Sequence, residues 1–370
     1  MSFVQHLEKL PEHRSPLLDR FRHLLSGAQP LETLAAEAAQ LTRRHFGHTM
    51  RLFAPLYVSN ECVNICKYCG FSRDNPILRV TLDLDQVEAE ARYLVQEGFR
   101  SILIVAGEHP KFVSESYLED CIKRLRRLVP SVSLEVGPME TEQYRPLVQA
   151  GADGLIVYQE TYHPATYAEL HVAGPKKDFA WRLECPERAA AAGFRRIGIG
   201  ALLGLAPWQE EVLALAAHTE YLLKHCWKSF VTVSFPRLRP AAGEFQPQVH
   251  LTDHEFTRLI CAFRICFPQI GLVMSTREPA RLRDGLAPLG ITLMSAGAHT
   301  EPGGYTGAGR ENLHRTEKGK VLPTIQSEGE FATEQFAVSD NRPAAAVVSR
   351  LKQLGFDPVW KDWDHALAET

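Results

Sequence analysis

Three cysteines in one short segment have the type and spacing that iron chemistry requires. Cys62, Cys66 and Cys69 follow the pattern C-x3-C-x2-C within SNECVNICKYCGFSRDN. Cysteine thiolates are the usual protein ligands of iron–sulfur clusters, and a [4Fe–4S] cube has four irons to be ligated. Three thiolates from one loop leave the fourth iron open to a small molecule. The segment therefore predicts a [4Fe–4S] cluster with one open coordination position.

A zinc ion held by these cysteines and a distant histidine is the alternative for the same segment. Structural zinc sites more often use two C-x2-C pairs, and the sequence has no second pair. The other five cysteines are scattered through segments with helical periodicity, and we expect them to be buried, inert thiols. They are Cys121, Cys185, Cys226, Cys261 and Cys266.

The segments that must position this loop alternate between two kinds. Short runs rich in β-forming residues are separated by stretches whose apolar residues recur at helical spacing. Strands that alternate with helices predict a parallel sheet, and eight strands favour a closed (β/α)8 TIM-type barrel over a doubly wound open sheet. The predicted strands cover residues 51–58, 101–107, 132–137, 154–159, 196–203, 231–237, 271–276 and 291–296.

The barrel is expected to occupy residues 51–297. Residues 1–50 form a predicted helical N-terminal extension, and residues 298–370 a C-terminal extension that packs on the barrel, with a helix over 343–354. Parallel α/β folds bind ligands at the carboxyl ends of their strands. The candidate residues are therefore the polar side chains at these ends, which are Glu108, Glu160, Arg237, Arg277 and Ser295.

Charge and hydropathy exclude several classes of function. The net charge is −3 and the sequence pI is near 6.6, so the chain lacks the basic footprint of a nucleic acid partner. No apolar run approaches the roughly 18 residues that a membrane-spanning helix needs. The N-terminal residues also lack the apolar core of a signal peptide. We therefore expect a cytoplasmic protein with no nucleic acid or membrane partner.

The cysteine loop also resembles a known family. Its spacing, with the aromatic Tyr68 just before Cys69, is similar to the signature of the radical S-adenosylmethionine (SAM) superfamily. The resemblance implies that the open iron binds the amino and carboxylate groups of SAM. An electron from the cluster then cleaves SAM to methionine and a 5′-deoxyadenosyl radical. The protein would supply orientation and exclusion of water.

The resemblance implies roles for further residues around SAM. Gly107 and Glu108 follow Ala106 and resemble the Gly-Gly-Glu element that binds the methionyl amine, although alanine replaces the first glycine. Glu160 matches a carboxylate that contacts the ribose or the amine of SAM. Arg182 matches an arginine that pairs with the SAM carboxylate, as a bidentate guanidinium does.

Motifs along nearly the whole chain narrow the resemblance to the ThiH family, the tyrosine lyases (2-iminoacetate synthases) of thiamine biosynthesis. This family implies radical cleavage of the Cα–Cβ bond of L-tyrosine to p-cresol and dehydroglycine. Arg277 would hold the substrate carboxylate, Ser295 would add a hydrogen bond, and Tyr57 resembles a tyrosine that clamps the substrate. The motifs are LYVSNECVNICKYCGFSRDN, VYQETYHPATYAELH, GIGALLGL, MSTREP, SAGAHTEPGGY and PVWKDWD.

The same resemblance suggests alternative functions and implies partners. A HydG-like tyrosine lyase carries a second cluster on C-terminal cysteines, whereas no cysteine follows Cys266 here. A tryptophan lyase and a zinc-stabilised, non-enzymatic barrel remain as alternatives. The resemblance implies delivery of dehydroglycine to the thiazole synthase ThiG, because free dehydroglycine hydrolyses readily. It also implies an electron donor of the flavodoxin or ferredoxin type.

Overall fold

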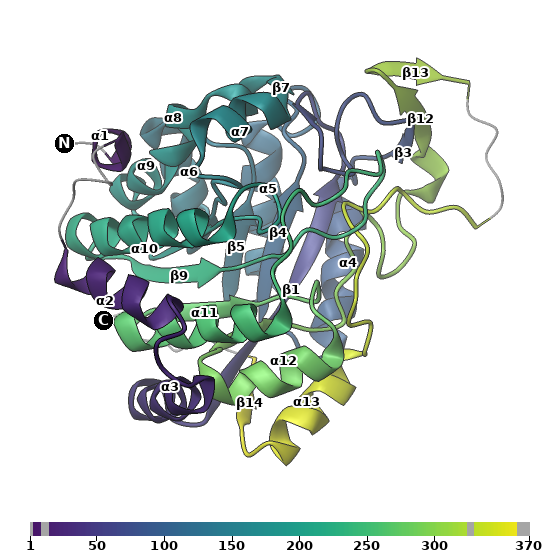
Figure 1. Ribbon diagram of the computed structural model, residues 1–370. Coiled ribbons are helices and arrows are strands. Elements are labelled where there is room, and N and C mark those ends of the chain that lie inside the picture. The colour runs from purple at the N-terminus through teal and green to yellow at the C-terminus, as the bar shows by residue number, and fades with distance from the viewer. Residues whose placement is uncertain (1–2, 9–14, 324–328, 361–370) are drawn as a thin grey trace.

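The computed structural model describes residues 3–8, 15–323 and 329–360 (Figure 1). Within these residues, eight parallel strands form a barrel that the pairing of β11 with β1 closes. This closure confirms the predicted (β/α)8 barrel and excludes the doubly wound open sheet. In barrel order the strands are β1 (Thr49–Ser59), β4 (Ser101–Ala106), β5 (Ser131–Glu135), β6 (Gly154–Ile156), β8 (Arg196–Gly200), β9 (Phe230–Ser234), β10 (Gly271–Met274) and β11 (Leu293–Ser295).

Helices surround the barrel because each strand presents one apolar face outward. In β5, Val132 and Leu134 are fully buried in the core under the helices, whereas alternate residues point into the barrel. The covering helices are α4 (Leu84–Gln96), α5 (Glu115–Arg126), α6 (Thr141–Gln149), α7 (Pro164–Leu170), α8 (Phe179–Leu183), α9 (Cys185–Ala192), α10 (Trp208–His225), α11 (Asp253–Cys266) and α12 (Ala280–Leu286). No helix in the described ranges is long and apolar enough to cross a lipid bilayer.

The described residues before the barrel form three helices. They are α1 (Phe3–Glu8), α2 (Pro16–Leu25) and α3 (Leu31–Phe46). In Figure 1, α2 lies against α10 and α11, and α3 lies against α11. The α2 helix begins at Pro16 because Ser15 caps it and accepts a hydrogen bond from the Leu18 amide. Phe21 on α2 packs edge-on against Phe263 of α11, so these helices cover one side of the barrel.

The segment after β11 contributes pieces that the sequence did not predict. The predicted helix over 343–354 is confirmed as α13 (Ala344–Gln353). Beyond it β14 (Asp357–Val359) pairs with the start of β1, and Trp360 packs on Phe99. Residues 361–364 of the PVWKDWD motif lie outside the described residues. The other short elements are β2 (Ile65–Cys66), β3 (Ile77–Arg79), β7 (His171–Ala173), η1 (Pro175–Lys177), η2 (Ala287–Leu289), η3 (Arg310–Asn312), β12 (His314–Glu317) and β13 (Lys320–Leu322).

Candidate active site

The cysteine loop leaves the carboxyl end of β1 and is held by a buried arginine. Arg79 on β3 donates hydrogen bonds to the carbonyls of Asn60, Phe71 and Ser72, which lie before and after the three cysteines. The Asn60 side chain in turn donates to the Leu78 carbonyl at 2.8 Å. These contacts tie both ends of the loop to β3.

Amide groups lie close to two of the three loop sulfurs. Among the described residues, no group of three or more His, Cys, Asp or Glu side chains is placed to hold one ion. A tetrahedral zinc ion would bring its ligand atoms within about 4 Å of one another, so the side chains of the described residues would have to move to hold one. Amide groups do approach the sulfurs, as suits thiolates: Asn64 Nδ2 lies 3.7 Å from Cys62 Sγ, and Gln335 Nε2 lies 4.0 Å from Cys69 Sγ.

Burial favours the protonated form of two of the loop thiols, Cys66 and Cys69. It raises the pKa of Cys66 and of Cys69, and the nearby Lys176 lowers each pKa by less. A buried thiolate is stable only when a positive charge compensates it. Cluster binding at this loop must therefore release protons.

Gly107 and Glu108 lie directly against the cysteine loop. A Cβ atom at Gly107 would lie 2.2 Å from the Glu61 carbonyl oxygen, so only glycine allows this approach. The Val63 amide donates to the Glu108 carbonyl at 2.8 Å, and Asn64 Nδ2 donates to the Glu108 carboxylate at 2.8 Å. Both predicted residues thus support the loop, and their contact with SAM stays a prediction.

Glu160 follows β6 and is an ion-paired carboxylate. Its Oε1 lies 2.7 Å from Lys176 Nζ and 3.5 Å from Arg182 Nη2. Burial alone would raise the pKa of Glu160, but the charges of Lys176 and Arg182 outweigh burial and hold its pKa below the usual range. Arg182 also donates to the Tyr158 carbonyl at 2.7 Å. Glu160 and Arg182, which the sequence analysis assigned separately to SAM, therefore meet in the structure, with Lys176 as a partner that the sequence did not reveal.

The backbone at Glu160 is held in an unusual conformation. Its backbone angle φ is +71°, a value that residues other than glycine rarely adopt and that costs about 1–3 kcal/mol. The next residues are clamped by the buried carboxylate of Glu211 on α10, which accepts from Thr161 Oγ1 at 2.6 Å and from the Tyr162 amide at 2.8 Å. This clamp directs the Glu160 side chain toward Lys176.

Tyr68, the aromatic residue before Cys69, is anchored beside these charges. Its hydroxyl lies 2.8 Å from Nε2 of His171, while Nδ1 of His171 lies 2.8 Å from the Tyr167 carbonyl. Because Nδ1 must donate to that carbonyl, Nε2 accepts from Tyr68. Burial, together with the charge of Lys176, lowers the pKa of His171 to about 3, so the imidazole is neutral.

A cavity at the carboxyl ends of the strands is lined by Tyr68, Glu160 and Lys176. It encloses about 470 Å³, its opening included, and Cys69 forms part of its wall. It brings together four sequence-predicted residues, Tyr68, Cys69, Glu160 and Arg277. Arg277 stacks on the Phe336 ring with 3.3 Å between its Cζ atom and the ring centroid. No described residue makes an ion pair with its guanidinium, which is therefore available to an anionic ligand.

Two predicted substrate residues are not among the side chains that line this cavity. Tyr57 is buried, and its hydroxyl donates to Gln335 Oε1 at 2.8 Å, so it acts on the cavity through Gln335. Ser295 instead ties two strands together: its hydroxyl accepts from the Thr276 amide at 3.1 Å, and its carbonyl accepts from Arg283. Ser295 thus does not line this cavity, and its hydrogen bond to the substrate stays a prediction.

The cavity also contains residues that sequence reasoning missed. Glu135 is the last residue of β5. The sequence analysis extended this strand to residue 137, so it did not consider Glu135 as a strand-end residue. Arg239 has a buried Nε atom without a partner. Gln335 and Phe336 come from the C-terminal segment, and nothing in their local sequence indicates that they reach the barrel.

Gln335 and Phe336 belong to a strap, residues 334–342, that crosses the barrel mouth. The Gly70 amide donates to the Gln335 carbonyl at 3.2 Å, and the amides of Ser339 and Asp340 donate to the Thr276 carbonyl at 2.9 and 3.1 Å. A Cβ atom at Gly70 would lie 2.5 Å from the Gln335 carbonyl oxygen, so the strap and the cysteine loop touch backbone to backbone.

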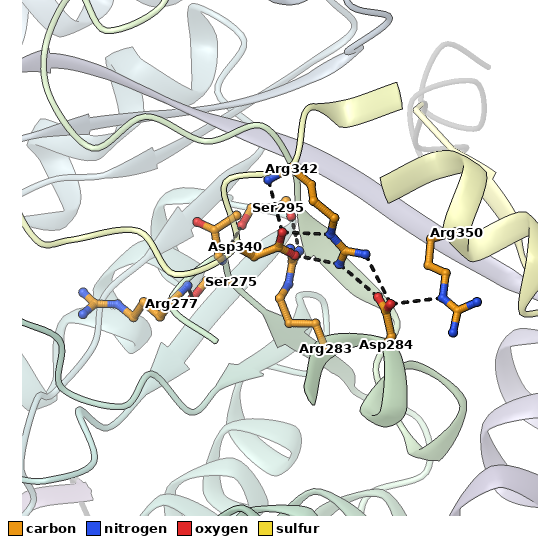
Figure 2. Close-up of polar contacts among 9 residues, drawn as sticks. Ser275, Arg277, Arg283, Asp284, Ser295, Asp340, Arg342 and Arg350 are labelled. Atoms are coloured by element: carbon orange, nitrogen blue, oxygen red, sulfur yellow. Dashed lines mark hydrogen bonds and ion pairs between the residues drawn. The ribbon is translucent and has the colours of Figure 1, made fainter. Parts of the chain in front are cut away.

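A charge network fastens the strap to the barrel (Figure 2). Asp340 is fully buried and lies between Arg283 of α12 and Arg342, whose Nη2 is 2.7 Å from its carboxylate. Arg342 continues to Asp284 at 2.9 Å, and Asp284 is 3.0 Å from Nε of Arg350 on α13. Figure 2 shows that Arg277 points away from this network, which leaves its guanidinium to the cavity.

Comparison with known families agrees with this geometry. Residues 56–216 match the family described as the radical SAM superfamily, and residues 234–357 match the biotin and thiamin synthesis associated domain. The closed barrel and the three-cysteine loop thus define a radical SAM enzyme, a class that uses a [4Fe–4S] cluster and SAM.

Sequence relatives identify the particular family. The chain is 42% identical over 341 residues to the 2-iminoacetate synthase of Escherichia coli, covering 92% of this chain and 85% of the relative. It is 41% identical to the 2-iminoacetate synthase of Salmonella typhimurium, covering 93% and 86%. The chain therefore belongs to the 2-iminoacetate synthase family.

Solved structures show the same architecture. The FeFe-hydrogenase maturase HydG from Carboxydothermus hydrogenoformans superposes with a TM-score of 0.82 at 33% identity, covering 98% of this chain and 80% of that one. The methylornithine synthase PylB superposes with a TM-score of 0.72 at 20% identity, covering 98% of each chain, and this likeness concerns the fold alone.

Proposed function

We propose that this protein is a SAM-dependent carbon–carbon lyase that cleaves the Cα–Cβ bond of L-tyrosine to p-cresol and dehydroglycine (2-iminoacetate). The observation that carries the proposal is the cavity in which Cys69, two carboxylates and the unpaired Arg277 meet. An amino acid zwitterion needs one cation and one anion in the same space, and the cavity offers both. Its relatives over most of the chain are named 2-iminoacetate synthases.

The residues divide the work between cofactor and substrate. Cys62, Cys66 and Cys69 would hold the cluster, and the cluster and SAM together supply a 5′-deoxyadenosyl radical when bound. Glu160, kept ionised by Lys176 and Arg182, offers acceptors to the hydroxyl or amino groups of SAM. Arg277 pairs with the tyrosine carboxylate, and the stacked Phe336 holds the guanidinium in place.

Anaerobic incubation of the reconstituted protein with tyrosine, SAM and a reductant tests this function. We expect p-cresol and 5′-deoxyadenosine in comparable amounts, without carbon monoxide or cyanide, because the relatives that match most of the chain are named 2-iminoacetate synthases. Indole-derived products from tryptophan, with no p-cresol from tyrosine, would make the protein a tryptophan lyase instead. Failure to cleave either amino acid would refute the proposed activity.

Replacing Arg277 by lysine should weaken tyrosine use about 10- to 100-fold while SAM binding stays intact. Lysine keeps the charge but loses the planar fork and the stacking on Phe336, and a hydrogen bond to a charged group contributes about 1.5–3 kcal/mol. The measurement is kcat/KM for p-cresol formation together with the affinity for SAM.

Arg281→Lys is the matched control, since Arg281 lies on the exposed face of α12 and should behave like the wild type. Arg239 also lines the cavity without a partner for its Nε atom. Wild-type kinetics in Arg277→Lys, with a large loss in Arg239→Lys, would transfer the carboxylate assignment to Arg239.

The partners and the compartment are part of the same proposal. Dehydroglycine hydrolyses readily in water, which favours direct transfer to the thiazole synthase ThiG. A low-potential electron donor of the flavodoxin or ferredoxin type would reduce the cluster. All eight cysteines are free thiols, as is usual in a reducing compartment, and this supports a cytoplasmic location.

A further inference from the structure

Glu135 is a charged residue on the inner face of the barrel. It is paired in register with Val105 of β4, which is paired with Tyr57 of β1, so the three residues lie at one level of the barrel. Tyr57 and Val105 belong to an inward-facing apolar cluster, and residues paired in register point to the same face of a sheet. The Glu135 side chain therefore points inward and forms part of the cavity wall.

No other described residue satisfies this carboxylate. It makes no hydrogen bond or ion pair at contact distance, although Arg277 and Lys176 are near enough to influence it. A buried carboxylate without a partner is costly unless a ligand supplies one. Glu135 thus lacks what a substrate ammonium group would provide, on the same cavity wall as the unpaired Arg277.

The other carboxylates near the cysteine loop are already engaged. Glu160 is held by Lys176 and Arg182, and Glu108 accepts from Asn64. A carboxylate held by two cations is a weak base because its charged form is stabilised. Among the described groups that line the cavity, Glu135 is therefore the carboxylate best suited to take a proton.

We propose that Glu135 is a catalytic residue that binds the ammonium group of the substrate and removes one proton from it. One N–H bond of the ammonium breaks and one O–H bond forms on the Glu135 carboxylate, which leaves a neutral amine and a neutral carboxylic acid. No oxidant or reductant takes part in this step. The inference rests on the proposed tyrosine cleavage, in which a hydrogen atom is taken from the substrate amine, and it names the group that prepares that nitrogen.

The electrostatics of the cavity suit such a transfer. Burial, and then the charge of Glu160, raise the pKa of Glu135 to about 7, although three cations oppose this rise. Burial also lowers the pKa of an ammonium ion, so the two pKa values approach each other and the proton can move with little cost. The charged and titratable groups that face Glu135 are Tyr57, Tyr158, Glu160, Lys176, Arg182 and Arg277.

Glu135→Gln tests the inference because glutamine keeps the shape but cannot accept the proton. We expect p-cresol formation to fall at least about 100-fold, the usual loss when a general base is removed. Iron content, sulfide content and SAM affinity should equal those of the wild type. The rate of the wild type should fall as the pH drops below about 7, because Glu135 must be ionised to act, and the remaining rate of the variant should lack this decline.

Binding measurements separate this role from a structural one. The affinity for tyrosine should fall about tenfold in Glu135→Gln, whereas the affinity for 3-(4-hydroxyphenyl)propanoate, which lacks the amino group, should stay within about threefold. Glu142→Gln, on the exposed side of α6, is the control and should match the wild type. Equal weakening of both ligands, or a p-cresol rate within threefold of the wild type, would overturn the proposal. If the wild type itself makes no p-cresol, the proposed function fails, and that result is distinct.

Discussion

Replacement of Cys66 by serine is expected to abolish cluster assembly and all SAM cleavage. Cys66 is the most buried of the three loop cysteines, and its backbone amide donates a hydrogen bond to Ser72 Oγ at 3.2 Å. The loop backbone would persist in the variant because Arg79 holds it independently of the side chain. A cube bound by only two thiolates lacks the ligands that its irons require. The measurement is iron and sulfide per chain after anaerobic reconstitution, followed by 5′-deoxyadenosine formation.

Cys266→Ser provides the matched control. Cys266 is also buried, at the end of α11, but it lies away from the cysteine loop. This variant should take up as much iron and sulfide as the wild type. A Cys66 variant that still assembles a full cluster and cleaves SAM would contradict the assignment of the three-cysteine loop.

Replacement of Asp340 by asparagine is expected to lower the free energy of unfolding by about 3–5 kcal/mol, the cost of breaking a buried ion pair from one side. Arg283 and Asp340 are both fully buried, and the variant would leave the Arg283 charge without compensation. The strap would also loosen, because the Asp340 side chain fastens it to Arg283. The Asp340 amide donates to the carbonyl of Thr276, so the loosened part of the strap lies next to Arg277. Tyrosine affinity should therefore fall together with stability. Denaturant unfolding and tyrosine binding, both under anaerobic conditions, measure the two effects.

Arg350→Ala is the control for this prediction. It removes an exposed member of the same network and should change the free energy of unfolding by less than about 1 kcal/mol.

Burial would raise the pKa of Asp340, but its hydrogen bond with Arg342 and the Arg283 charge hold this pKa below the usual value of 3.8. The stabilisation is therefore complete above pH 3.8 and is lost as the pH falls further, through the lowered pKa. An Asp340→Asn variant as stable as the wild type would show that the network does not fasten the strap.

The cysteine loop could be predicted from the sequence because its chemistry is local. Three ligands within one short segment come together whatever the rest of the chain does, so the spacing of Cys62, Cys66 and Cys69 is informative by itself. The barrel could be predicted for a similar reason, since the alternation of strands and helices admits few parallel arrangements. The strand ends then indicated Glu160 and Arg277, which do meet in the cavity.

The remainder of the site depends on contacts between distant segments. Gln335 is 278 positions from Tyr57, to which it is hydrogen-bonded, and no local pattern encodes such a pairing. Ser295 was predicted in the site because it ends a strand, and in the structure its hydroxyl accepts from the Thr276 amide, a contact that the sequence did not predict. A strand end places a residue near the mouth of the barrel, whereas register and neighbours decide what its side chain touches.

The sequence by itself thus determined the class of chemistry and the scaffold, through local ligand spacing and periodicity. Only the tertiary structure decided which charges are free: Lys176 and Arg182 neutralise Glu160, while Glu135 and Arg277 are left without partners in the described part of the chain. The physical reason is that the state of a buried charge depends on its neighbours across the barrel. Those neighbours come from segments that the linear sequence does not place side by side.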